Sequence, residues 1–240
     1  MRVALVNLGG NQGKTTLAVN LFAPRMPEAK ILAVETINAA GGDLGAAVEQ
    51  LKGEQFARIY AELASADDLI LDVGASNIED FLVGLSRFED GHDEIDLFVI
   101  PCTSDTKERT EAMKTAHMLS ALGVPPEKIQ FVFNRVVDGV EAEFADVLNF
   151  AKKSGVAFAN PACVVPESEL FALLSDKKMN IVQALSDITD YKAELKAATR
   201  SDDKKAWRRA MDMLAITKQS KSMDRQLQHV FELLTSTVEA

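Results

Sequence analysis

A glycine-rich segment, Gly9 to Thr16, follows a short apolar run and opens a helix-patterned stretch. Glycines at such a junction let successive backbone N–H groups point at phosphate oxygens, and the helix amino terminus adds partial positive charge. Lys14 supplies a charge to the β- and γ-phosphates, and the Thr15 hydroxyl can bind Mg²⁺. The usual pattern has glycine five residues before Gly13, where Leu8 stands here. The segment predicts a nucleotide and Mg²⁺ site made of Gly9, Gly10, Asn11, Gln12, Gly13, Lys14, Thr15 and Thr16.

Two later strand ends carry polar groups that suit the same ligand. Leu69 to Gly74 is an apolar run ending in Asp-x-Gly, so Asp72 can hold Mg²⁺ while the Gly74 N–H contacts a γ-phosphate. Lys14 and Asp72 are the predicted catalytic groups. Asn134 ends another apolar run, and its amide can pair with a base edge. A guanine-reading Asn-Lys-x-Asp is absent because Asp138 comes one residue too late, which favours adenine and therefore ATP.

Short β-branched runs alternate with longer helix-patterned stretches along the chain. Apolar strands separated by helices indicate a doubly wound α/β fold, with a mainly parallel sheet and helices on both faces. We expect strands at 2–6, 30–35, 69–72, 96–101, 129–134 and 162–165, and helices at 15–22, 46–63, 78–88, 106–122, 140–153 and 167–185. The remaining chain reads as helices. Residues 1–190 are thus predicted to be the nucleotide-binding domain and residues 191–240 a helical extension.

Charge is distributed unevenly over the 240 residues, whose net charge is −10. Between Lys192 and Arg225 there are ten Lys or Arg against five Asp or Glu, a local balance of +5. Trp207, Ala210, Met211, Leu214 and Ala215 form an apolar stripe at helical spacing, with Trp207 expected as a packing anchor. Basic side chains off this stripe are candidate contacts for the DNA backbone, the alternative being an ordinary solvated helix face: Lys204, Lys205, Arg208 and Arg209.

No apolar run approaches the roughly 18 residues of a membrane span, and the first residues lack the pattern of a signal peptide. The two cysteines lie far apart in apolar runs, as buried reduced thiols do. These features predict a soluble cytoplasmic protein, associated with the nucleoid if the basic face binds DNA.

The motifs resemble those of the ParA/MinD family of deviant Walker ATPases over roughly residues 1 to 190. Gly10, Gly13, Lys14, Thr15 and Thr16 match that family's phosphate loop, and Asp72 with Gly74 matches its second switch. Asn134 and the segment 165–168, which contains Pro166, match the positions that hold adenine. Segments 7–16, 23–25 and 35–39 look most like the StbB plasmid stability proteins. The resemblance implies a nucleotide-dependent switch in plasmid stability, partition or conjugative transfer. It also implies an ATP-dependent homodimer and a DNA-binding partner protein from the same operon.

The chain departs from the family pattern at two places. The signature lysine that reaches across the family's ATP-bound dimer would stand at position 9, which is Gly9. The first switch usually carries two acids, where this chain has Glu35 and Ile37. Glu35 can still bind Mg²⁺, but isoleucine cannot orient water, and losing such a group typically costs about 10²–10⁴ in rate. We therefore expect firm ATP binding with slow or partner-stimulated hydrolysis.

Two other functions remain open from the sequence. A phosphoryl-transfer or ligase enzyme on the same scaffold would need a second polar cluster, and the three histidines are scattered. A membrane-positioning ATPase of the MinD type would lay the carboxyl-terminal amphipathic helix on anionic lipid. Its apolar stripe is weak and the last fifteen residues carry almost no basic charge, so a membrane partner is not expected.

Overall fold

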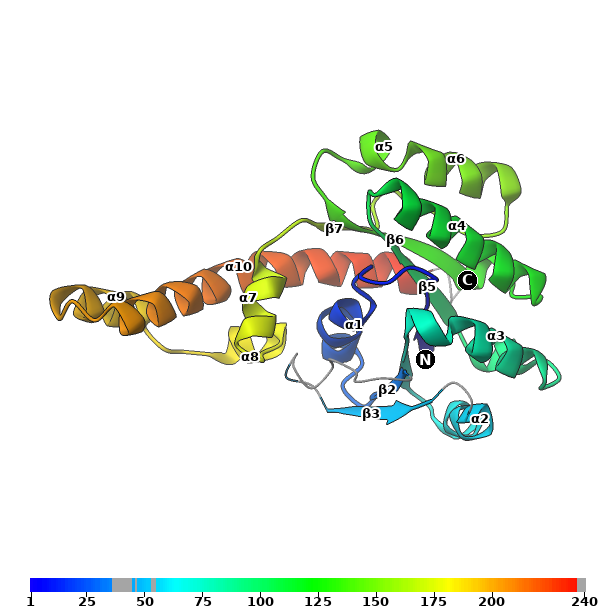
Figure 1. The fold of residues 1–240 in the computed structure, drawn as a ribbon, viewed down its shortest axis with the longest axis horizontal. Coiled ribbons are helices and arrows are strands. Elements are labelled where there is room, and N and C mark those ends of the chain that lie inside the picture. Colours follow the sequence, from blue (N-terminus) through cyan, green and yellow to red (C-terminus); the bar gives the residue numbers. More distant parts are fainter. Residues whose placement is uncertain (36–44, 46, 53–54, 237–240) are drawn as a thin grey trace.

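Seven parallel strands form a single sheet at the centre of the protein, in a computed structural model that describes residues 1–35, 45, 47–52 and 55–236 (Figure 1). Each described strand pair is parallel, and the strand order is β3-β2-β4-β1-β5-β6-β7. This confirms the predicted α/β class. The strands are β1 (Arg2–Leu5), β2 (Lys30–Val34), β3 (Val48–Leu51), β4 (Leu69–Val73), β5 (Leu97–Cys102), β6 (Ile129–Val136) and β7 (Val164–Pro166).

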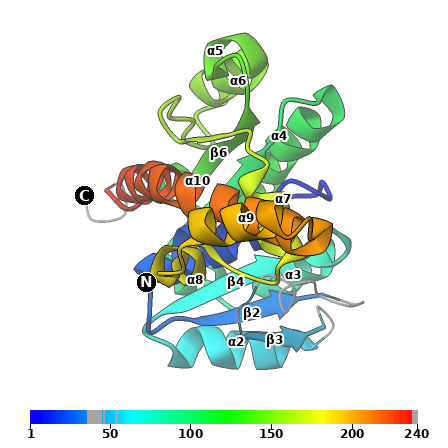
Figure 2. The ribbon, with the colours of Figure 1, turned by 90° about the vertical axis from the view of Figure 1, so that its left-hand side faces the viewer.

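Successive strand residues point to opposite faces, so each strand contributes to two separate cores. Ala4 and Leu71 pack with the helices of one face, and Val3 and Ile70 with those of the other. The first face is covered by α2 (Phe56–Ser65), α3 (Ile78–Ser86), α4 (Thr106–Ala121), α5 (Val140–Glu143) and α6 (Ala145–Ser154). The second is covered by α1 (Lys14–Leu17) with its π-helical continuation Ala18–Phe22, α7 (Leu170–Asp176), α8 (Ile181–Ser186) and the second half of α10 (Lys204–Thr235). Figure 2 shows α2 and α8 on opposite sides of β2 to β4.

The prediction of one helix over residues 46–63 was wrong. Val48–Leu51 is strand β3, which pairs in parallel with β2, and the helix begins only at Phe56. The Glu35 N–H donates to the Leu51 carbonyl at 2.9 Å. Pairing with the open edge of β2 decides the conformation here, because strand preference depends on neighbours more than on local composition.

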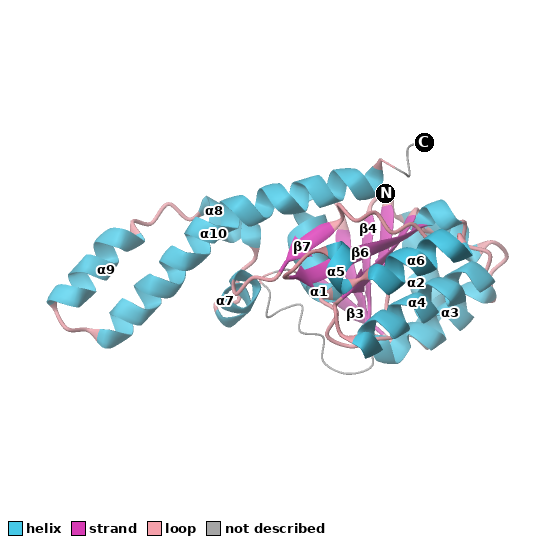
Figure 3. Ribbon diagram, turned by 90° about the horizontal axis from the view of Figure 1, so that it is seen from above, coloured by secondary structure: helices cyan, strands magenta, loops and turns pink. Residues whose placement is uncertain are grey.

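Helices α9 (Tyr191–Arg200) and α10 form a hairpin that projects from the sheet and its helices (Figures 1 and 3). The buried stripe of α10 differs from the predicted one, since Trp207 is 41 % and Met211 is 40 % exposed. Near the hairpin tip α10 contacts mainly α9, so only a narrow face is covered. The stripe that is buried consists of Ala210, Met213, Ile216, Ser220, Met223, Leu227, Val230 and Leu234.

The second half of α10 belongs to the core of the sheet's second face. Leu227, Val230 and Leu234 are fully buried and pack with Val3 and Leu5 of β1. The division of the chain at residue 190 remains a prediction, and this half of α10 lies beyond it yet packs against the sheet.

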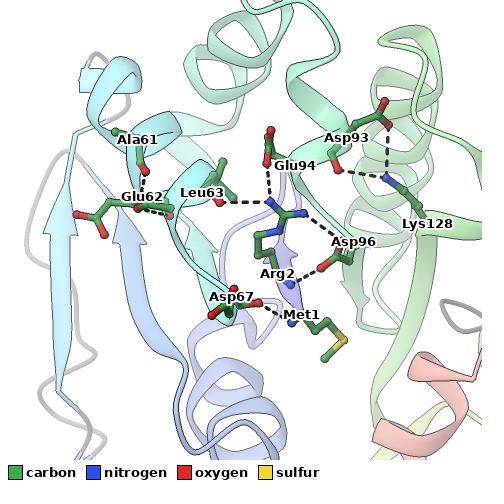
Figure 4. Close-up of polar contacts among 11 residues, drawn as sticks. Met1, Arg2, Ala61, Glu62, Leu63, Asp67, Asp93, Glu94, Asp96 and Lys128 are labelled. Carbon is green, nitrogen blue, oxygen red and sulfur yellow. Dashed lines mark hydrogen bonds and ion pairs between the residues drawn. The ribbon is translucent and has the colours of Figure 1, made fainter.

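Ion pairs occupy the edge of the sheet where the strands begin (Figure 4). Arg2 contacts Glu94 at 2.5 Å and Asp96 at 3.5 Å, and Lys128 contacts Asp93 at 3.5 Å. These side chains are partly exposed, so each pair stabilises the fold by only about 0–1 kcal/mol. Ligand sites in such folds lie at the opposite edge, where the strands end.

Candidate functional site

The segment Gly9–Thr16 connects β1 to α1 at the edge where the strands end. Gly13 has φ +87° and precedes the first residue of α1, and the Leu17 N–H donates to its carbonyl at 2.9 Å. A Cβ at Gly13 would lie 2.4 Å from Asn134 Nδ2. Both the left-handed backbone and this close approach require glycine, which positions the following N–H groups at the start of α1.

Lys14 lies inside the loop and not in solvent. Its Nζ donates to the carbonyls of Gly9 at 2.9 Å and Asn7 at 3.2 Å. Burial lowers the pKa of Lys14, and the nearby Asp72 carboxylate opposes that change. A phosphate oxygen presented to the loop would offer this ammonium a stronger acceptor than either carbonyl, because hydrogen bonds between ionised groups are the stronger ones.

Asp72 and Glu35 end neighbouring strands and face the loop. Asp72 is 3 % exposed, and the Thr15 hydroxyl lies beside its carboxylate. Burial raises the pKa of Asp72, and burial together with the Asp72 charge raises the pKa of Glu35. Both carboxylates line a cavity of about 280 Å³ that Lys14 and Thr15 also line.

These oxygen donors suit Mg²⁺, which prefers one or two carboxylates combined with phosphate oxygens and water. Thr15, Asp72 and Glu35 are the groups that would hold the ion. Within the described ranges, no set of three or more His, Cys, Asp or Glu side chains gathers as a metal site. The oxygen donors described at this site, two carboxylates and a hydroxyl, fit a Mg²⁺ ion that also binds phosphate oxygens.

The Gly74 N–H, which was expected to contact a γ-phosphate, donates to the Val34 carbonyl at 3.0 Å. A Cβ at Gly74 would lie 2.8 Å from Cγ of Glu35. Gly74 thus holds the ends of β2 and β4 together, and its N–H can reach a phosphate only if that contact opens.

A second cavity of about 410 Å³ adjoins the loop and is closed on one side by α7. It has the volume expected of a small-molecule site, which is roughly 300–1,000 Å³. The predicted base-binding residues Asn134 and Pro166 both line it. Further lining residues come from the loop, from β6 and from α7, and include Arg135, Glu167, Ser168, Phe171, Ala172 and Ser175.

The amide of Asn134 is bonded to the protein backbone. Its Nδ2 donates to the Gln12 carbonyl at 2.8 Å, and its Oδ1 accepts from the Arg135 N–H at 3.1 Å. Asn134 therefore supports the segment Gly9–Thr16. Its role in binding a base stays a prediction, and the sequence did not indicate this supporting contact.

Gln12 also supports the loop. Its Oε1 accepts from the Thr103 N–H at 3.0 Å, and its Nε2 donates to Glu108 of α4. Glu108 and Glu111 crowd the loop, since a Cβ at Gly9 would lie 2.6 Å and 2.8 Å from their Oε2 atoms. Sequence reasoning missed both acids, because nothing in the spacing of α4 shows that it passes position 9.

The other predicted groups lie elsewhere. Ile37 falls outside the described residues. Lys204, Lys205, Arg208 and Arg209 are exposed on the first turns of α10, at the hairpin end and away from both cavities. No described helix has the length and apolar character needed to cross a membrane.

Comparison with known proteins gives a likeness of fold. No protein-family model and no curated protein matches the chain. Among solved structures, apo McdA from Cyanothece matches with a TM-score of 0.52 at 15 % identity, covering 89 % of this chain and 98 % of that one. MinD from Aquifex aeolicus matches with a TM-score of 0.54 at 13 % identity, covering 88 % and 94 %.

A third solved structure, the cell division ATPase MinD from Pyrococcus furiosus, gives a TM-score of 0.52 at 13 % identity, covering 91 % of this chain and 98 % of that one. These three matches extend over 88–91 % of this chain and 94–98 % of the solved structures. The chain has the fold of the MinD and McdA structures.

Proposed function

We propose that this protein is an ATP-dependent molecular switch that binds Mg²⁺ and ATP at Gly9–Thr16 and hydrolyses ATP slowly without a partner. The observation that carries the proposal is the placement of the buried Asp72 with Lys14 and Thr15 around one cavity at the loop. A buried carboxylate, a hydroxyl and an ammonium at the start of a helix are the groups that a Mg²⁺–triphosphate needs.

The comparisons support an ATPase as the coarse function. The structures that share the fold include a cell division ATPase, MinD. The resemblance of Gly10–Thr16, Asp72 and Gly74 to the ParA/MinD motifs points to the same chemistry. The second cavity, with Asn134 and Pro166 beside the loop, offers space for the adenine.

Each residue has a defined part in binding. The N–H groups at the start of α1 bind phosphate oxygens, and Lys14 neutralises charge on the β- and γ-phosphates. Thr15, Asp72 and Glu35 would hold Mg²⁺, which would stabilise the charge that develops on the phosphates. Gly9 offers no cation, so transition-state charge is stabilised less than in relatives with the signature lysine. Turnover is therefore slow.

A switch also needs a contact that changes with the nucleotide. The hydrogen bond from Gly74 to Val34 can serve as such a contact, because Gly74 lines the cavity beside Lys14 while its N–H is held by the Val34 carbonyl. We infer that a γ-phosphate draws this N–H away from Val34 and reorganises the segments that follow Glu35 and Asp72. Those segments would then favour a nucleotide-dependent homodimer or a partner surface.

The biological role that we propose is plasmid stability, partition or conjugative transfer. It is supported by the resemblance of segments 7–16, 23–25 and 35–39 to the StbB proteins. The exposed basic end of the α9–α10 hairpin would contact DNA backbone directly, or a DNA-binding partner protein would supply that contact. The protein would act in the cytoplasm at the nucleoid.

Calorimetric titration of Mg²⁺-ATP into the purified protein tests the proposal, with Lys14→Ala and GTP as controls. We expect ATP binding that is lost in Lys14→Ala and weaker binding of GTP. An absence of ATP binding by the wild-type protein would overturn the proposed function. Phosphate release at several turnovers per minute without a partner would overturn the slow hydrolysis but not the binding site.

A further inference from the structure

Arg135 has an unusual backbone conformation at the end of β6. Its φ is +58°, in the left-handed region that few side chains other than glycine, asparagine and aspartate adopt. The pairing of β6 with β7 shifts register between Asn134 and Val136, so Arg135 bulges out of the ladder. Bulges of this kind redirect a side chain and are common next to active sites. Strain of this kind persists where the surrounding structure holds it in place.

The bulge places Arg135 between the two cavities. It lines the 410 Å³ cavity beside Asn134 and the 280 Å³ cavity beside Lys14. Among the described residues, Arg135 is the one residue outside Gly9–Thr16 that lines both. A nucleotide with its phosphates at the loop and its base against α7 would pass this point.

The guanidinium of Arg135 is not engaged with the rest of the described chain. Its backbone N–H donates to Asn134, but its exposed side chain makes no hydrogen bond or ion pair there. Arg25 and Arg109, in contrast, are held by carboxylates of the protein. The five guanidinium donors of Arg135 are therefore available to a ligand in either cavity that this residue lines.

The charges that line the cavity beside Lys14 also favour a phosphate-binding role for Arg135. The 280 Å³ cavity is lined by two carboxylates, Glu35 and Asp72, and by two cations, Lys14 and Arg135. Position 9 adds no charge, and Glu108 with Glu111 adds negative charge close by. Without Arg135, the side chains lining the phosphate cavity would carry more formal negative than positive charge before any phosphate entered.

We propose that Arg135 binds the phosphate chain of the nucleotide in cis and makes the site selective for nucleoside di- and triphosphates over adenosine. The planar guanidinium matches phosphate oxygens with two parallel hydrogen bonds. This inference rests on the proposed function, since it assigns a residue to the same site. Arg135 would thus be a second cation beside the phosphates, after Lys14, and both would come from the same chain.

The test compares the wild-type protein with Arg135→Asn, Arg135→Lys and the surface control Arg87→Asn. Asparagine tolerates a positive φ, so Arg135→Asn removes the charge without straining the bulge. Calorimetry with Mg²⁺-ATP, ADP and adenosine, repeated at two salt concentrations, measures the effect on each ligand. Urea denaturation confirms that each variant is folded.

We expect Arg135→Asn to weaken ATP and ADP binding by about 10- to 100-fold, as for the loss of charge-assisted hydrogen bonds, and to leave adenosine binding unchanged. Arg135→Lys should recover part of the loss, and Arg87→Asn should match the wild type. The salt dependence of ATP binding should become shallower in Arg135→Asn.

Equal ATP affinity in the wild type and Arg135→Asn would overturn the assignment of Arg135 and leave the proposed function intact. Equal weakening of ATP and adenosine would also overturn it, because the residue would then shape the whole cavity. A wild-type protein that binds neither ATP nor ADP would overturn the proposed function itself.

Discussion

The Arg25 guanidinium donates to both the carboxylate and the backbone carbonyl of Asp224, at 2.8 Å and 2.7 Å. The same side chain donates to the carbonyls of Asn20 and Leu21 in the π-helical turn that follows α1. Arg25 therefore ties the helix of the phosphate loop to the middle of α10. The Ala-Pro-Arg sequence, noted only as a point of resemblance, has a structural role in this chain.

Arg25→Ala should destabilise the protein by about 2–4 kcal/mol, because several hydrogen bonds to a buried charged group are lost together. The side chain of Arg25 is 7 % exposed. Arg209→Ala is the matched control, since the side chains of Arg209 and Glu194 are 66 % and 41 % exposed and their pair should contribute under about 1 kcal/mol. Urea denaturation measures both, and equal midpoints for the two variants would contradict the role given to Arg25.

Gly13→Ala should destabilise the fold and abolish ATP binding, whereas Gly10→Ala should be nearly silent for stability. A left-handed backbone costs an L-residue roughly 1–2 kcal/mol, and the new methyl group would press on Asn134. A Cβ at Gly10 meets no atom within 4 Å. Thermal unfolding checks the pair. Adding Asn134→Ala to Gly13→Ala should recover the part of the lost stability that comes from the steric clash between these two positions. If the effects of the two changes on stability were simply additive, the clash would be contradicted.

Asp72→Asn should make apo-protein stability less dependent on pH. Burial raises the pKa of Asp72 above its ordinary 3.8, so the folded state holds the proton more tightly than the unfolded chain. Stability contributed by this group is present below 3.8 and is lost as pH rises through the folded-state value. Urea denaturation at several pH values should show that the free energy of unfolding of Asp72→Asn rises relative to that of the wild type as pH increases toward neutrality.

The same variant tests the metal site. Removing one ligand should weaken the Mg²⁺ dependence of ATP binding at least about 10-fold, since even the loss of an outer-shell partner costs 10- to 100-fold. Titration of ATP with and without Mg²⁺ measures this. An unchanged Mg²⁺ dependence in Asp72→Asn would assign the metal to other groups.

Gly9→Lys alone should not accelerate ATP hydrolysis. The introduced ammonium would lie beside Glu108 and Glu111 and pair with them within the same chain. Changing both acids to Gln as well should release the lysine and raise turnover at least about 10-fold, because a cation supplied in trans is worth 10³–10⁵ in related phosphoryl transfers. Phosphate release is the measurement, and the double Gln variant without Lys is the control. A faster release of phosphate by the single variant Gly9→Lys would contradict the predicted pairing of the lysine with Glu108 and Glu111.

The tip of the α9–α10 hairpin should bind DNA without sequence preference. Changing Lys204, Lys205, Arg208 and Arg209 together to Ala should abolish retardation of duplex DNA. Before that change, affinity should fall with salt at a slope of about −0.9 per phosphate contacted. Lys152 and Lys153, exposed on α6, provide a control with the same charge change per residue. If the four-residue variant still retarded duplex DNA fully, the prediction would be contradicted and these side chains would form an ordinary solvated helix face.

The sequence was sufficient for the fold class, and for the position of the segment Gly9–Thr16 between a strand and a helix, because local sequence patterns determine both. Strand β4 reads as an apolar run ending in an acid, and the structure places Asp72 at the end of that strand facing the loop. Gly13 and Lys14 follow a strand and open a helix as their types require. These features need only neighbours along the chain.

The missed features depend on neighbours far away in sequence. Strand β3 forms because β2 offers an open edge, which overrides the helical preference of residues 46–51. Glu108 reaches Gly9 only through the crossing of α4, and Arg135 is aimed at the cavities by a register shift with β7. The apolar stripe of α10 was predicted correctly at Ala210 but wrongly at Trp207 and Met211, since α9 and the sheet decide which side of that helix is covered.

The second half of α10 bears on how the chain folds as it is synthesised. Gln130 in β6 donates to the Leu234 carbonyl at 3.0 Å, and Leu234 is buried against the same sheet face as Leu5. A ribosome adds about 5–20 residues each second, so roughly 10–50 seconds separate the synthesis of β1 from that of Leu234. Throughout that interval this face of the sheet lacks the part of its cover that α10 supplies. The nascent chain therefore completes its core only after almost all of the 240 residues have been synthesised.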